Sequence, residues 1–203
     1  MPNHNDRALN AIEHVAGWGF TPNIQQRIGA LAVIWSLFET NLETTIWALT
    51  GENVEGKRPS TDKSSVSTWI EVLPKHPERL SHSAQEVLQV TADAAKDLMD
   101  YRHAIMHGSV IPSATMPSFV RNPLWHGQKR GRMTHDAHVS ENLLDMAIDC
   151  AWVLCKVVFA TRSACTDPAA RLTLEGMKTE IARVRGMAGE LRHLTELMNH
   201  EKY

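Results

Sequence analysis

The sequence predicts an all-α, up-and-down bundle of about four long helices, with a short β-hairpin or extended loop inserted after the second of them. Apolar residues recur every three or four positions through long windows, and residues typical of helix caps stand at the ends of these windows. Stretches containing Pro and Gly separate them. The expected long helices cover residues 22–50 and 83–107, a stretch that opens at 140, and a last one from 167 to near 199.

The first long helix has the clearest boundaries. Thr21 can cap its start, and Gly51 follows its end. One residue departs from its apolar stripe, because Glu39 stands four positions after Trp35 and places a carboxylate at the edge of the core. Two interpretations stay open: Glu39 reaches water at the boundary, or it is the partner that holds Arg102 in place on a neighbouring helix.

Shorter elements connect the long helices. Residues 5–16 and 65–73 are predicted as short helices, and residues 51–64 as a loop. Pro74 and Pro77 interrupt the chain before the second long helix, and Gly108 is predicted to be the left-handed cap that ends it.

The stretch from 109 to 138 is the most irregular of the chain. Two apolar pairs, Val110-Ile111 and Phe119-Val120, predict the strands of a short hairpin. A basic patch follows and, with the aromatic residues Phe119 and Trp125, is a candidate for binding RNA through phosphates and base stacking. The patch consists of Arg121, Lys129, Arg130 and Arg132. A solvated loop is the alternative interpretation.

Composition predicts one cytoplasmic domain over residues 1–203. A hydrophobic content of 43% suffices for a core, and a net charge of −2 means that any attraction to nucleic acid is local. The three cysteines form no disulfide framework, which suits a reducing compartment. No signal peptide or membrane span is expected, because Asp149 and Lys156 interrupt the most apolar stretch.

The most informative stretch runs from Tyr101 to Gly108 and places Arg102, His103 and His107 on the last turns of a core-facing helix. On an ideal helix Arg102 and His107 point about 140° apart and lie about 7.5 Å apart along the axis. They converge on one ligand if the last turn unwinds at Gly108, or if a second copy of the helix approaches.

An Arg followed by a polar residue, and by a His five positions after the Arg, resembles the signature of the HEPN superfamily. Here the matching residues are Arg102, His103 and His107, and the resemblance spans residues 22–163, with residues 167–203 as an additional C-terminal helix. The resemblance implies a small all-α domain acting as a metal-independent endoribonuclease without a cofactor. It also implies a homodimer in which two motif helices meet, and a toxin or defence role in which an antitoxin-like protein is a partner.

The chemistry of RNA is consistent with this interpretation. RNA carries its own nucleophile, the 2′-OH, so cleavage needs a proton shuttle near neutral pH and a positive charge at the phosphate. His107 suits the first task and Arg102 the second, with His103, Glu39 and Asp100 as supporting residues. The expected products are a 2′,3′-cyclic phosphate and a 5′-OH end.

Two alternatives remain. Arg102 paired with Glu39 would tie the bundle together, giving a non-catalytic domain that binds RNA or protein. Alternatively, Asp100, His103 and His107 would bind a metal ion with Glu39 or Glu43 as further ligands from a neighbouring helix, because His103 stacks one turn before His107.

Overall fold

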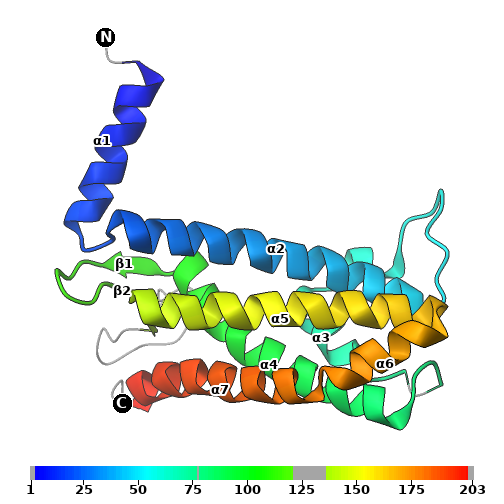
Figure 1. Ribbon diagram of the computed structural model, residues 1–203. Helices are drawn as coiled ribbons and strands as arrows, with labels where there is room; N and C mark the ends of the chain where they lie inside the picture. The colour runs from blue at the N-terminus through cyan, green and yellow to red at the C-terminus, as the bar shows by residue number, and fades with distance from the viewer. Residues whose placement is uncertain (1–2, 77, 121–135, 201–203) are drawn as a thin grey trace.

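The structure, a computed structural model, describes residues 3–76, 78–120 and 136–200 and is an all-α bundle with a small sheet, as the sequence predicts (Figure 1). Its α-helices are α1 (His4–Gly17), α2 (Pro22–Thr50), α3 (Val66–Val72), α4 (His82–His107), α5 (Glu141–Thr166), α6 (Pro168–Gly176) and α7 (Lys178–His200). A 3-10 turn covers Ser60–Lys63, and the strands are β1 (Ser109–Ile111), β2 (Ser118–Val120) and β3 (Ala137–His138).

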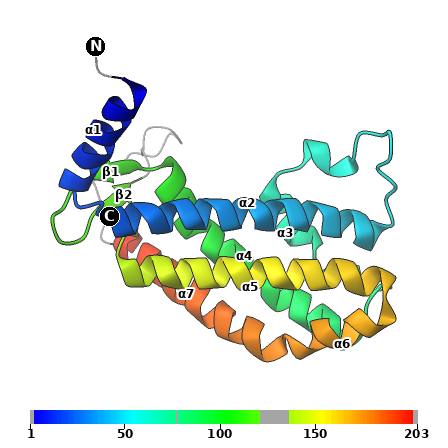
Figure 2. The same cartoon turned by 45° about the horizontal axis from the view of Figure 1, so that its top comes forward.

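The long helices α2, α4, α5 and α7 lie side by side and reverse direction from each to the next along the chain, so that α2 is parallel to α5 and α4 is parallel to α7 (Figure 1). The most extensive contacts join α2 to α5 and α4 to α7, and α5 also packs on α7. Because the directions alternate, the N-terminal ends of α2 and α5 meet the C-terminal ends of α4 and α7 at one end of the bundle. The sheet lies at this same end, next to the end of α4 (Figures 1 and 2).

Local sequence explains where the long helices begin and end. The hydroxyl oxygens of Thr21, Ser81 and Ser140 each accept a hydrogen bond from a backbone N–H in the first turn of α2, α4 and α5. Gly51 ends α2 in the left-handed conformation, with φ of 68°. These caps satisfy backbone groups that a helix leaves unpaired.

One sequence-based expectation is corrected, and the expected hairpin is confirmed and extended by a third strand. The helix expected from 167 to near 199 is two helices, because α6 ends at Gly176 and α7 begins at Lys178. The expected hairpin is part of a three-stranded antiparallel sheet in the order β1-β2-β3, in which Val110 pairs with Phe119 and Ser118 with His138. With two residues, β3 is too short to give a sequence signal.

One continuous apolar core lies between the long helices. Its largest fully buried side chains include Trp35 and Phe38 of α2, Leu98 of α4 and Leu154 of α5. No helix in the described part of the chain is long and apolar enough to cross a membrane.

Candidate functional site

The Arg102–His107 motif occupies the last turns of α4, where the chain leaves the bundle for β1. Gly108 follows at φ −82° and ψ 158°, so the predicted left-handed cap is wrong. Gly is still required, because a Cβ at this position would lie 2.4 Å from the backbone oxygen of Ala104 and 3.0 Å from the Cβ of Phe119. Close packing of the sheet against the end of α4, and not backbone handedness, therefore explains Gly108.

Tyr101 fixes this end of α4 to the sheet. Its side chain is buried, and its hydroxyl donates a hydrogen bond of 2.9 Å to the backbone oxygen of His138 in β3. Burial raises the pKa of the Tyr101 phenol, so the neutral donor is the stable form. The residue before Arg102 is thus held by a long-range contact between α4 and the sheet.

Arg102 is half-buried and faces α2. Its Cζ lies 6.0 Å from the centroid of the Trp35 ring, at the outer limit of a cation–π contact. Its buried Nε has no hydrogen-bond partner, and no carboxylate in the described residues forms a salt bridge with it. A guanidinium in such a position lacks the compensation that buried charges normally have.

Glu39 does not pair directly with Arg102, which corrects the direct-pair interpretation. Its Oε1 accepts a hydrogen bond of 2.5 Å from Nε1 of Trp35, one turn earlier on α2. The Trp35 indole therefore contacts both residues, the carboxylate through its N–H and the guanidinium over its ring. Glu39 orients the indole on which Arg102 rests, so its influence on Arg102 is indirect.

The two histidines lie against each other. The rings of His103 and His107 are 5.7 Å apart, centroid to centroid, and meet edge to face. His107 is exposed, and α4 remains helical through it. The last turn therefore does not unwind, and within one chain Arg102 and His107 keep the divergent directions of an ideal helix.

The described residues give no support to the metal-binding interpretation. In the described ranges, no group of three or more His, Cys, Asp or Glu side chains lies close enough to hold a metal ion, so Asp100, His103 and His107 do not form one. Glu43, proposed as a further ligand, instead accepts a hydrogen bond of 2.6 Å from Oγ1 of Thr61, which anchors the loop after α2. Glu39 accepts the hydrogen bond from Trp35 described above.

The predicted basic patch, with Arg121, Trp125, Lys129, Arg130 and Arg132, lies outside the described residues. Phe119, proposed with it as a stacking platform, is in the core and packs edge to face on Phe20 at 5.3 Å between ring centroids. Phe119 therefore does not face a ligand.

Sequence reasoning missed a buried carboxylate. Asp97 on α4 is 3% exposed and binds two arginines of α7, Arg185 and, at 2.9 Å, Arg192. Arg185 and Arg192 are seven positions apart, which places both on one face of a helix and is the signal available in the sequence. That signal identifies the partner helix only once α4 and α7 are known to be neighbours.

The chain was compared with models of protein families, with curated proteins and with solved structures, and nothing matched.

Proposed function

We propose that the protein is a metal-independent endoribonuclease whose site is the C-terminal end of α4. The observation that carries the proposal is the half-buried guanidinium of Arg102, whose buried Nε has no hydrogen-bond partner among the described residues, five residues before an exposed histidine. An RNA phosphate would supply the missing anion, and a planar fork of donors matches its oxygens. The resemblance of Arg102, His103 and His107 to the HEPN motif supports the same chemistry.

In the proposed reaction His107 takes the proton of a ribose 2′-OH, and the 2′-oxygen attacks the adjacent phosphorus. The bond from phosphorus to the 5′-oxygen breaks, which leaves a 2′,3′-cyclic phosphate on one fragment and, after protonation, a 5′-OH on the other. Arg102 stabilises the charge that develops on the phosphate oxygens. His103, which contacts the His107 ring, positions the imidazole.

A second copy of the chain completes the proposed site. Because α4 stays helical through His107, the two groups of one chain diverge by about 140°. Arg102 of one protomer and His107 of its partner could then act on the same phosphate. The homodimer is part of this proposal.

Cleavage of a structured RNA in excess EDTA tests it. The wild-type protein should produce fragments with cyclic phosphate ends, identified by mass spectrometry, and His107→Ala should lower the rate by about 10² to 10⁴, the contribution of general acid–base catalysis. His82→Ala, at the exposed opposite end of the same helix, is the matched control and should cleave normally. A requirement for added metal, or full activity of His107→Ala, would overturn the proposal.

One observation favours a second candidate, a non-catalytic domain that binds RNA or protein. The contact between Arg102 and the Trp35 ring joins α4 to α2, and its role could be to stabilise the fold. In that case the wild-type protein does not cleave RNA, and substitution of His107 changes nothing in the cleavage assay.

A further inference from the structure

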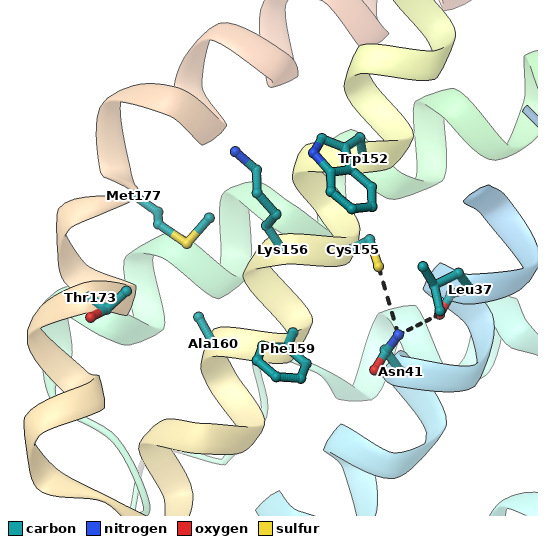
Figure 3. A pocket seen from close by; sticks show the side chains of 9 residues that line it. All are labelled: Leu37, Asn41, Trp152, Cys155, Lys156, Phe159, Ala160, Thr173 and Met177. Atoms are coloured by element: carbon teal, nitrogen blue, oxygen red, sulfur yellow. Dashed lines mark hydrogen bonds between the residues drawn. The ribbon is translucent and has the colours of Figure 1, made fainter. Parts of the chain in front are cut away.

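An apolar groove lies on the face of the bundle formed by α2, α5 and α6, and it encloses about 610 Å³ (Figure 3). Trp152 and Phe159 of α5 point into it, with Leu37 of α2 on one side and Met177 on the other. Lys156 is the charged residue of its lining. Water fills this groove at a cost, because its walls are apolar.

The groove belongs to a larger exposed apolar surface. Trp152 is 48% exposed and Phe159 53%, and Val33 lies one turn before Leu37 on the same side of α2. Single exposed apolar residues are ordinary, whereas a contiguous patch of large ones marks a surface that is covered by a partner.

Helix α1 carries a second uncovered apolar face. None of its residues is buried, and Leu9 and Ile12 are 50% and 47% exposed. Both views show α1 projecting away from the bundle (Figures 1 and 2). The C-terminal end of α1 contacts the bundle, where Val15 packs against the core. The face with Leu9 and Ile12 gains little stability as it stands, because tertiary burial supplies most helix stability in proteins.

The turn between α1 and α2 keeps α1 away from the groove of its own chain. The backbone oxygen of Trp18 accepts a hydrogen bond of 3.1 Å from the N–H of Ser113, which ties the turn to the loop after β1. Gly19 has φ of 93°, and a Cβ there would lie 1.9 Å from the Ser113 oxygen. Leu37 lies about 22 Å along α2 from this turn.

Charge on α1 complements charge beside the groove. Glu13 follows Leu9 by four residues, so its exposed carboxylate borders the apolar face of α1. Beside the groove, Lys156 is already paired with Glu180 of α7 at 2.5 Å, whereas the Arg162 guanidinium lies 5.0 Å from the centroid of the Phe159 ring. The Glu13 carboxylate of α1 is therefore complementary in charge to the Arg162 guanidinium beside the groove.

We propose that two copies of the chain exchange α1, with the apolar face of each α1 packing into the α2–α5 groove of the other copy. A half-exposed side chain of this size keeps on the order of 100 Å² of its surface in water. Each contact would cover six such side chains, and two symmetric contacts give on the order of 1,200 Å², the size at which specific interfaces begin. The six are Leu9, Ile12, Val33, Leu37, Trp152 and Phe159. This inference does not depend on the proposed ribonuclease activity.

Sedimentation velocity over a micromolar dilution series of the full-length protein tests the exchange. Wild type should reach twice the mass of one chain. Leu9→Glu/Ile12→Glu in α1 and Trp152→Ser/Phe159→Ser in the groove should each weaken self-association at least ten-fold. Leu172→Glu, which alters a 75% exposed apolar residue outside the groove lining, is the matched control and should associate as wild type does. Far-UV circular dichroism and urea midpoints verify that each variant is folded.

Mixing the two double variants gives the decisive result. One variant retains an intact groove and the other an intact α1, so the mixture should associate more tightly than either variant alone. It should associate more weakly than wild type, because it keeps one of the two contacts. A wild-type protein that stays monomeric, an α1 variant or groove variant that dimerises normally, or a mixture that associates no more tightly than either variant alone would each overturn the exchange. Normal dimers of these variants that still cleave RNA would overturn the exchange without affecting the proposed function.

Discussion

Two charged positions on α4 differ in what surrounds them. Asp97 is buried and bound by two arginines of α7, so its charge is compensated within the fold. Arg102, five residues later and about 7.5 Å along the same helix, has an aromatic ring beside it and an unpaired Nε. The first position joins two helices, whereas no carboxylate of the described residues forms a salt bridge with Arg102 at the second.

This difference separates a structural charge from a candidate functional one. A buried charge that the fold needs is paired, because leaving it unpaired costs several kcal/mol. A charge that receives a ligand is held in place but left open toward that ligand. By this criterion Asp97 belongs to the architecture and Arg102 to the proposed site, and substitutions at the two positions should affect different quantities.

The largest expected effect is on stability at the Asp97 position. Replacing both Arg185 and Arg192 by Ala strands the buried carboxylate and should lower the free energy of unfolding by about 3 to 5 kcal/mol, measured by urea denaturation. Arg183→Ala is the control on the same helix, because its ion pair with Asp149 is exposed and contributes less than about 1 kcal/mol. Equal losses of unfolding free energy in the two variants would show that the buried Asp97 contributes no more than an exposed ion pair does.

Glu39→Ala should cost about 1.5 to 3 kcal/mol, the range for a hydrogen bond to a charged group, because it removes the acceptor of the buried Trp35 N–H. A direct ion pair with Arg102 would have predicted a larger loss, about 3 to 5 kcal/mol. Glu39→Gln retains an oxygen for Trp35 and should lose less than about 1 kcal/mol. Urea denaturation of both variants distinguishes the two arrangements. A Gln variant as unstable as the Ala variant would show that the negative charge of Glu39 matters more than its hydrogen bond to Trp35.

Tyr101→Phe should lower the free energy of unfolding by about 1 kcal/mol, because it removes one buried hydrogen bond to His138 and retains the ring. If the tie to the sheet positions Arg102, RNA cleavage should also fall in this variant at temperatures where it is fully folded. Unchanged cleavage would show that the hydroxyl stabilises the fold without positioning the site.

Arg102→Gln should have the smallest effect on stability, within about 0.5 kcal/mol, because no ion pair is lost. A cleavage-resistant, 2′-O-methylated RNA should raise the melting temperature of the wild-type protein, since a ligand that binds the native state stabilises it. The Gln variant should lose that increase. A large loss of stability in Arg102→Gln would instead assign Arg102 a structural role.

The sequence predicts the bundle well because its signals are local. Helix periodicity and the caps at Thr21 and Gly51 depend on neighbouring residues, and these boundaries agree with the structure. The break at Gly176 was not predicted, because one Gly within an apolar pattern is often tolerated inside a helix.

The contacts of the candidate site are not local, and this limits what the sequence predicts. The sequence pattern suggests that Glu39 and Arg102 face each other across two helices. In the structure the Trp35 indole N–H donates a hydrogen bond to the Glu39 carboxylate instead, and spacing alone does not predict this contact. Asp97 lies among apolar residues of α4, so its burial is evident only when α7 is placed beside it. Periodicity identifies faces of helices, whereas partners between helices depend on packing.

The central claim is that Arg102 of one copy and His107 of another act on the same RNA phosphate. Co-expression of Arg102→Gln and His107→Ala chains tests it most directly, because a mixed dimer contains one site with both groups intact and one with neither. Each variant alone should cleave RNA at least about 10²-fold more slowly than wild type, because general acid–base catalysis contributes about that much. Half of the dimers in a random mixture are mixed, and each has one intact site of two. The mixed preparation should therefore regain about a quarter of the wild-type rate of RNA cleavage in EDTA. A mixed preparation no more active than either variant alone would contradict the shared site.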